Sequence, residues 1–500
     1  MGTLATGCFK MKVVFEKKSF DGIGSDALIV PCIEGRVPGW AVELLKEASV
    51  ESDFDASKGK RFLLPVPKKP YKRLVLLGLG KEGKLKLEDF RVVGGHAYSL
   101  AAGNRLENCA LWVNDKMELS QGDAAAAFIE GFILKSLKLD VYKTEKEGEE
   151  SHEKKVSSLT IVSEEDLSRK VREAVVLAES QNYVRRLDLE PSNVMSPQRM
   201  ADEAMLLAKK YGMDCRVYTM GELEKKGMGG LISVGKGSAK PPVLVRLAYN
   251  KGKNFPKIAL VGKAVTFDTG GISLKPGKGM ASMKYDKSGA LVLMGVLRAL
   301  AELKVPVSAN LVFGAAENMP DGNATNPGDI VKTFSGKTIE IINTDAEGRV
   351  CLADAVAYAA KQKPELIVDV ATLTGAANII LGRHGICMMG TDVEALKLFE
   401  DAGRETYERV WPLPVWEEYS EMVKSDIADV KNLGSEQGEA GTITAGMFIK
   451  EFNSGLPWIH LDIASVDLME HPNAYLPKGP SARGVRLITS FIKKWIQNKG

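Results

Sequence analysis

The fold is decided by residues 258–267 (IALVGKAVTF), which are followed by residues 268–271 (DTGG). The run is almost continuously apolar and ends in small and polar residues, which is the pattern of a strand buried on both faces of a sheet. Such strands are typical of parallel sheets that helices cover on both sides, and ligands bind beyond their carboxyl ends. The stretch therefore predicts an α/β fold and directs the search for chemistry to the residues after Phe267.

Similar runs recur through the second half of the chain, at 242–248, 307–313, 339–342, 366–370 and 458–463. Helical patterns separate most of them, so we predict a C-terminal α/β domain with a mostly parallel central sheet flanked by helices. Residues 1–165 also alternate strand-like and helix-like segments, and helical spacing over 166–189 predicts a linker helix. The predicted organisation is an N-terminal α/β domain (1–165), a linker helix (166–189) and a C-terminal domain (190–500), as a 500-residue chain requires.

Composition excludes several classes of protein. The chain has 67 Lys and Arg against 64 Asp and Glu, a net charge of +3, and 45% hydrophobic residues, which is typical of a globular protein. No apolar run approaches the roughly 18 residues of a membrane span, and the N-terminus lacks the apolar segment of a signal peptide. Six cysteines without a CxxC pair indicate reduced thiols, so we expect a cytoplasmic protein.

Acidic residues follow the predicted strands. Asp268 ends the strand at 258–267, Asp286 precedes a predicted helix, and residues 343–349 (NTDAEGR) carry Asp345 and Glu347. Side chains two apart in an extended segment share a face, so these last two can converge on one point. We expect all four carboxylates in one crevice at the same side of the sheet.

Four carboxylates in one crevice would repel one another unless cations neutralise them. Two divalent ions would balance the charge, Lys263 could lose its proton and join as an amine ligand, and Lys275 and Arg349 would face anionic groups. No histidine lies nearby, which favours oxygen-bound Mg²⁺, Mn²⁺, Co²⁺ or Zn²⁺. The alternative is a surface network of acidic and basic residues without metal.

The motif at 343–349 resembles the signature of the leucyl (cytosol) aminopeptidase family of two-metal exopeptidases. Supporting segments resemble the same family: 261–263 (VGK), 266–268 (TFD), 317–320 (ENMP), 327–329 (PGD), 371–375 (ATLTG), 441–445 (GTITA) and 460–464 (HLDIA). The resemblance covers about residue 190 to the C-terminus, and only 75–81 in the N-terminal domain.

The resemblance implies hydrolysis of the N-terminal amino acid, with a Leu-type preference, from peptides that have a free N-terminus. It makes Lys275 the group that polarises the scissile carbonyl and Arg349 the anchor of a bicarbonate that shuttles protons, while two metals activate a shared water. It also implies a homohexamer. The implied ions are two divalent ions, Mn²⁺ or Zn²⁺ with Co²⁺ or Mg²⁺ as alternatives, and their implied ligands are Lys263, Asp268, Asp286, Asp345 and Glu347. The implied substrate pocket consists of Met283, Thr372, Gly375 and Ala464.

The chain departs from the family pattern in the pocket region. Lys287-Ser288 stands where a Met-Gly pair is expected, and Ala264 replaces a usual glycine. Asp467 occupies a position where some relatives have an apolar wall residue. If Asp467 pointed into the pocket it would favour basic N-terminal residues, but a side chain turned to solvent is the favoured expectation.

Two alternatives belong to other classes. Residues 78–84 (GLGKEGK) follow a predicted strand and resemble a phosphate loop, but Leu85 lacks the hydroxyl that binds Mg²⁺. Some relatives of the family bind DNA as regulators, although the net charge gives no basic footprint, so we expect no nucleic-acid or membrane partner. The absence of G-x-S-x-G excludes a nucleophile elbow, and Cys351 and His460 are expected to be packed core residues.

Overall fold

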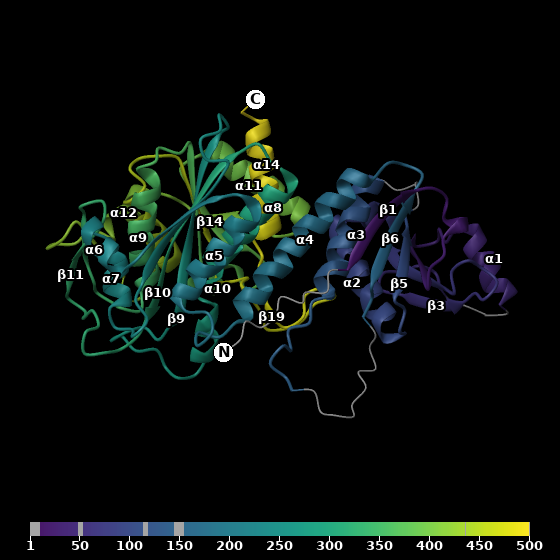
Figure 1. Cartoon of the computed structure of the whole chain (residues 1–500), viewed down its shortest axis with the longest axis horizontal. Helices are drawn as coiled ribbons and strands as arrows, with labels where there is room; N and C mark the ends of the chain where they lie inside the picture. Colours follow the sequence, from purple (N-terminus) through teal and green to yellow (C-terminus); the bar gives the residue numbers. More distant parts are fainter. Residues whose placement is uncertain (1–10, 49–53, 114–118, 145–154, 436, 500) are drawn as a thin grey trace. The chain divides into compact units, whose positions relative to one another are not determined.

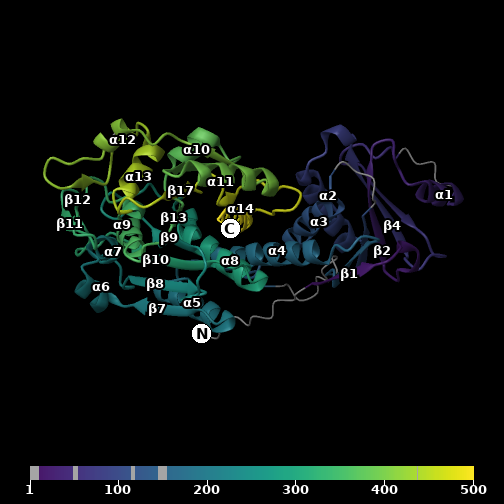
Figure 2. The same ribbon diagram turned by 90° about the horizontal axis from the view of Figure 1, so that it is seen from above.

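The computed structural model describes residues 11–48, 54–113, 119–144, 155–435 and 437–499. Contacts between residues divide the chain into two compact units (Figures 1 and 2). The first unit is Met1–Glu179 with His471–Pro477, and the second is Ser180–Glu470 with Lys478–Gly500. No helix among the described residues is long and apolar enough to cross a membrane.

The first unit is built on a six-stranded sheet in the order β1-β6-β5-β2-β4-β3. Only β3 runs antiparallel to its neighbour, because it forms a hairpin with β4. The strands are β1 (Lys12–Lys17), β2 (Ala27–Ile33), β3 (Arg61–Pro65), β4 (Arg73–Gly80), β5 (Asn108–Trp112) and β6 (Ser158–Ser163). The helices are α1 (Gly39–Glu47), α2 (Leu87–Gly103) and α3 (Gln121–Lys135). This unit has the α/β character that the sequence predicts.

The segment His471–Pro477 contributes to the first unit although it comes late in the chain. Tyr475 is almost fully buried there, and its hydroxyl donates a hydrogen bond of 2.8 Å to Glu88 Oε1 of α2. A buried phenol that is hydrogen-bonded to a carboxylate holds this segment to α2.

The second unit contains an eight-stranded sheet in the order β15-β14-β17-β13-β9-β10-β8-β7. Its centre, β17-β13-β9-β10, is parallel, and antiparallel pairs occur toward both edges. The central strands are β9 (Lys257–Asp268), β10 (Ser308–Asn318), β13 (Leu366–Ala371) and β17 (Trp458–Asp462). The outer strands are β7 (Asp214–Tyr218), β8 (Val243–Tyr249), β14 (Ile386–Gly390) and β15 (Val410–Pro412). The apolar run at 258–267 is thus a central strand, as expected of a run buried on both faces.

Helices cover both faces of this sheet (Figure 2). One apolar core lies under α5 (Pro197–Tyr211), α8 (Ser288–Leu303), α11 (Val393–Thr406) and α14 (Val485–Gln497). The opposite core lies under α7 (Gly229–Gly235), α9 (Glu347–Ala360) and α13 (Gly441–Lys450). The remaining helices are α4 (Ser168–Leu189), α6 (Met220–Lys226), α10 (Ala376–Leu381) and α12 (Glu417–Glu421). The predicted α/β class with a mostly parallel sheet centre is confirmed.

One predicted strand of the central sheet was wrong. The run at 339–342 forms β12 (Thr338–Glu340), which pairs with β11 (Ile330–Lys332) and β16 (Val430–Lys431) in a separate small sheet. Beyond the end of β12, the backbone N–H of Ile342 donates to the side chain of Asn432 at 2.8 Å and not to a neighbouring strand. Asp345 therefore reaches the site from the turn between β12 and α9, and Glu347 reaches it as the first residue of α9; neither comes from the end of a central strand.

Candidate metal centre and active site

A cavity of about 410 Å³ lies in the second unit, where β9, β13 and β17 end. Its lining includes all five expected metal ligands, Lys263, Asp268, Asp286, Asp345 and Glu347, together with Lys275. It also includes the four expected pocket residues, Met283, Thr372, Gly375 and Ala464. Among the expected site residues, Arg349 alone is not part of this lining.

Strand β9 and its neighbours fix the position of Asp268. This carboxylate is the last residue of β9, and its Oδ1 accepts the side-chain amide of Asn318 at 2.8 Å and the backbone N–H of Gly270 at 2.9 Å. The amide of Asn318 also donates to the carbonyl oxygen of Thr344 at 3.1 Å. Asn318 therefore ties the end of β9 to the segment that carries Asp345.

Three carboxylates form the centre of the cluster. Oxygen atoms of Asp268, Asp286 and Glu347 lie within 4.8 Å of one another, and all three residues are buried. The ammonium of Lys263 lies 2.7 Å from Asp286 Oδ1 and 2.9 Å from Glu347 Oε1. Lys275 Nζ lies 2.8 Å from Asp268 Oδ2 and also contacts Asp345. Each of the four carboxylates thus contacts a lysine, but the carboxylates outnumber the lysines.

The electrostatics of the cluster reflect burial and mutual repulsion. Burial raises the pKa of Asp286 and of Glu347, and the carboxylate of Asp268 raises both further, while Lys263 opposes the effect. Burial alone would lower the pKa of Lys263, but the surrounding carboxylates raise it overall. The group behaves as a set of acids that needs additional positive charge.

The residues present fit divalent cations. Asp286 Oδ2 is buried and has no hydrogen-bond partner among the described residues, although buried carboxylate oxygens are normally paired. Clustered carboxylate oxygens are the donors that hard and borderline divalent ions prefer, and metal binding would supply the missing positive charge. The donor set therefore suits the ions that the sequence predicts.

Glycine at position 348 is required by packing against Lys263. A Cβ atom at Gly348 would lie 2.6 Å from Lys263 Cε and 2.7 Å from its Nζ. Any larger residue would require the end of the Lys263 side chain to shift. This explains why glycine follows Glu347 in the motif.

Arg349 lies in the first turn of α9 and is buried. Its guanidinium interacts electrostatically with the carboxylates of Glu347 and Asp462. Burial lowers its pKa to about 10, although those two carboxylates act in the opposite direction. Its Nε has no hydrogen-bond partner among the described residues. A buried guanidinium donor at the start of a helix is suited to an anion.

Sequence reasoning missed the residues that hold the cavity walls. Asp462, at the end of β17, accepts the backbone N–H groups of Leu373 and Ala464, each at 3.1 Å, and the hydroxyl of Thr374 at 2.7 Å. One buried carboxylate thereby fixes both the 371–375 loop and the wall at Ala464. A polar residue ending an apolar strand is the available sequence signal for such a role. Thr372, expected only as pocket wall, also donates to Asp286 Oδ1 at 2.8 Å.

The expected solvent-facing orientation of Asp467 was wrong, because this residue lines the cavity. Its backbone N–H donates to the carbonyl of Ile463 at 3.0 Å, and its own carbonyl accepts the N–H of Ser481 at 2.7 Å. These two bonds fix the backbone of the wall that begins at Ala464. A lone aspartate after a strand gives no sign of such bonds in the sequence.

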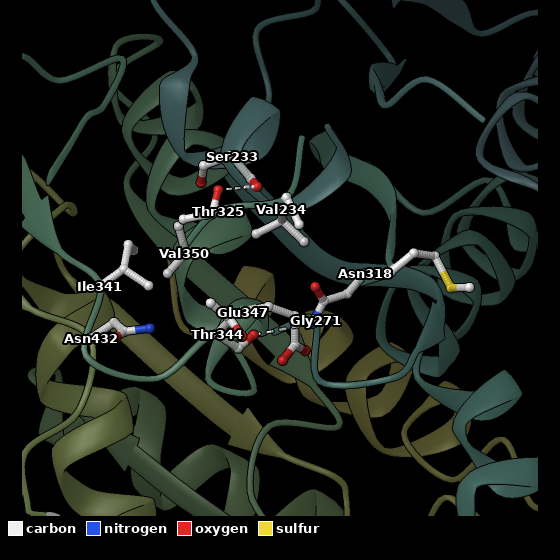
Figure 3. Close-up of a pocket in the computed structure, with 12 residues that line it drawn as sticks. Ser233, Val234, Gly271, Asn318, Thr325, Ile341, Thr344, Glu347, Val350 and Asn432 are labelled. Atoms are coloured by element: carbon white, nitrogen blue, oxygen red, sulfur yellow. Dashed lines mark hydrogen bonds between the residues drawn. The ribbon is translucent and has the colours of Figure 1, made fainter. Parts of the chain in front are cut away.

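A second, smaller cavity of about 20 Å³ shares Glu347 with the larger cavity (Figure 3). Gly271, Asn318, Thr344 and Glu347 are among its lining residues. Its volume suits about one water molecule. The larger cavity has room for a much larger group.

The phosphate-loop alternative finds no support in the described loop. A Cβ at Gly78 would lie 2.1 Å from the carbonyl oxygen of Ser57, so this glycine is needed for close chain packing. The start of α2 already has an anion, because Asp89 accepts the backbone N–H of Lys86 at 2.8 Å. His460 is a buried core residue whose Nδ1 lies 2.5 Å from Asp369 Oδ1, as expected.

The fold and the carboxylate–lysine cluster place the protein among the α/β enzymes that bind divalent metal ions at the carboxyl edge of a sheet. Residues 182–489 match the catalytic domain of the cytosol aminopeptidase family, and residues 37–146 match the N-terminal domain of the same family. The chain belongs to the cytosol aminopeptidase family and is a metal-dependent aminopeptidase.

Relatives and solved structures agree with this assignment. A probable cytosol aminopeptidase of Solibacter usitatus is 39% identical over 97% of this chain and 100% of the relative, and one of a Geobacter species is 41% identical over 94% and 96%. The bottromycin maturation enzyme BotP in complex with Mn has a TM-score of 0.84 at 31% identity and covers 94% of this chain and 100% of its own. A mutant tomato leucine aminopeptidase has a TM-score of 0.85 at 27% identity and covers 97% of both chains.

Proposed function

We propose that the enzyme removes the N-terminal amino acid from peptides that carry a free amine, and that residues 190–500 form its catalytic domain beside an N-terminal domain at 1–165 and a linker helix at 166–189. The observation that carries the proposal is the cavity where three buried carboxylates approach within 4.8 Å beside two lysines. Two divalent ions, Mn²⁺ or Zn²⁺, would be held by Lys263, Asp268, Asp286, Asp345 and Glu347.

When bound, such ions act as Lewis acids, lower the pKa of a water and stabilise negative charge on a peptide carbonyl. Lys275 lies at the edge of the same cluster, where its ammonium adds positive charge beside the reacting carbonyl. The unpaired Nε of Arg349 would hold bicarbonate, which would supply a base and acid for proton transfer in the site.

The pocket walls support a preference for Leu-type side chains. Met283 and Ala464 supply apolar surface next to the open backbone at Gly375, while Thr372 is held by its hydrogen bond to Asp286. Burial of an aliphatic side chain against such walls contributes about 25 cal/mol per Å².

The proposal also covers the subunit assembly of the enzyme and its cellular compartment. The family resemblance implies a homohexamer, which we include in the proposal. Light scattering of the purified protein tests it. The five cysteines that the structure describes are free, and the relatives are named cytosol aminopeptidases, which supports a cytoplasmic protein.

The decisive experiment uses purified full-length protein freed of metal by a chelator and then loaded separately with Mn²⁺, Zn²⁺, Co²⁺ or Mg²⁺. Leucine amide should be hydrolysed only after metal addition, and N-acetyl-leucine amide should remain intact because its amine is blocked. Hydrolysis of the acetylated substrate, or full activity in a verified metal-free sample, would overturn the proposal.

A further inference from the structure

We propose that the outer part of the same cavity binds a cationic side chain of the substrate's N-terminal residue, with Asp467 as the carboxylate that meets it. The enzyme then accepts Arg and Lys in addition to Leu. This inference rests on the proposed aminopeptidase function and adds a substrate class to it.

The acidic residues that line the cavity fall into two sets. The inner set, Asp268, Asp286, Asp345 and Glu347, contacts Lys263 or Lys275. The outer set is Asp467 and Glu470, which lie on the wall that follows Ala464. The two sets therefore differ in what neutralises them.

The outer set has two carboxylates, but only one of them forms an ion pair with an arginine or lysine among the described residues. Glu470 Oε1 pairs with Arg383 Nη2 at 2.7 Å, and Arg383 Nη1 also donates to the carbonyl of Leu468 at 3.3 Å. Asp467 makes no ion pair with a lysine or arginine in the part of the chain that the structure describes. One carboxyl group of this wall is left for a ligand.

The surroundings of Asp467 suit an aliphatic stem with a charged end. Met283 and Ala464 line the same cavity, and the methylene groups of Arg or Lys pack on apolar surface while the charged end reaches a polar group. A guanidinium forms charge-assisted hydrogen bonds with a carboxylate, which are about twice as strong as neutral ones. Leu would use only the apolar part of the same pocket.

The groups facing Asp467 oppose its ionisation in the free enzyme. Burial raises its pKa to about 8, and the carboxylates of Asp188 and Asp462 add to the effect, while the N–H of Leu468 and the guanidinium of Arg383 lower it. The phenol of Tyr285, whose own pKa burial raises to about 12, is the other titratable group coupled to it. The ionised fraction of Asp467 therefore increases between about pH 7 and pH 9.

The test compares arginine amide and leucine amide with the metal-loaded, full-length enzyme. Asp467→Asn keeps the shape of the side chain and removes its charge, so the ratio of kcat/KM for Arg to that for Leu should fall by about tenfold or more. Asp426→Asn, which makes the same charge change at an exposed position, should leave the ratio unchanged.

The pH profile provides a readout that a purely structural role would not change. In the parent enzyme the Arg/Leu ratio should rise from pH 7 to pH 9, because Asp467 loses its proton while the α-amine is common to both substrates. In Asp467→Asn the ratio should stay flat.

An unchanged ratio in Asp467→Asn with normal leucine amide hydrolysis would overturn this inference and leave the proposed function intact. Equal pH profiles of the ratio in parent and variant would also overturn it. A parent enzyme that hydrolyses neither amide after metal loading would overturn the proposed function and this inference together.

Discussion

Two strand ends of this molecule have similar sequences and different roles. Strand β4 of the first unit continues into 78–84 (GLGKEGK), and β9 of the second unit continues into 268–275 (DTGGISLK). Strand β9 lies between two parallel neighbours, whereas β4 has one parallel neighbour, β2, and one antiparallel neighbour, β3. Both continuations contain glycines and end in a lysine. Only the second lies in a cavity with clustered charges.

The neighbouring elements explain the difference. Around β9, the turn before α8, the start of α9 and the end of β10 bring Asp286, Glu347 and Asn318 to one point. At β4, Asp89 is used by the backbone of α2, and Glu82 pairs with Arg36. A loop after a strand becomes a functional site when other segments bring charged and hydrogen-bonding side chains to it. Substitutions at the two loops should therefore differ in their effect on activity.

Glu347→Gln should produce the largest effect. The neutral amide removes a charge that contacts Lys263 and an oxygen of the three-carboxylate cluster, so metal content and activity should both fall. We expect kcat/KM to drop by more than about 10³-fold, beyond the usual cost of one lost oxyanion donor. Metal analysis and leucine amide hydrolysis measure this, with exposed Glu418→Gln as the control. Retention of both metals would remove Glu347 from the ligand set.

Lys275→Ala should lower kcat by roughly 10²–10³-fold, the effect of removing one group that stabilises the oxyanion. Metal content should stay at the parent level, because the carboxylates remain. Lys278→Ala, three residues further along the same loop and exposed, is the matched control and should behave like the parent. Loss of metal in Lys275→Ala would show that this lysine holds the cluster together instead.

Arg349→Ala should have a smaller effect, below about 10²-fold in kcat, the lower end of general acid–base contributions, because water can partly replace the bound anion. Any stimulation of the parent by added bicarbonate should disappear in the variant. Rates measured with and without bicarbonate at constant pH check this. Stimulation that persists in the variant would place the anion elsewhere.

Lys84→Ala, in the loop after β4, should have the smallest effect. The residue is exposed, and exposed substitutions usually change stability by no more than about 0.5 kcal/mol. We expect kcat/KM for leucine amide within about twofold of the parent. A tenfold loss would give the first loop a role in catalysis and end the contrast between the two strand ends.

The sequence predicted the central strands well, because a strand buried on both faces must be apolar along its whole length. This held for β9, β10, β13 and β17, whose buried side chains form the cores below α8 and α9. The carboxylates of the cavity were also predictable, since strand ends and helix starts at one edge of a sheet converge. Asp268, Asp286 and Glu347 do come together.

Other parts depended on contacts that no local pattern encodes. The run at 339–342 is apolar, like the central strands, but it pairs with two short strands in a separate small sheet. The roles of Asn318 and Asp462 arise from hydrogen bonds to segments 26 and 89 residues away. The backbone position of Asp467 follows from its main-chain bonds to Ile463 and Ser481.

The segment that carries Tyr475 has a consequence for how this protein could evolve. Because His471–Pro477 is packed into the first unit, the chain passes from one unit to the other three times, at residues 179/180, 470/471 and 477/478. A recombination event that joined only residues 180–500 to a new N-terminal domain would leave the buried phenol of Tyr475 without its partner Glu88. We therefore expect the two units to be inherited together. A gene that encoded the second unit alone would need compensating changes in the seven residues His471–Pro477.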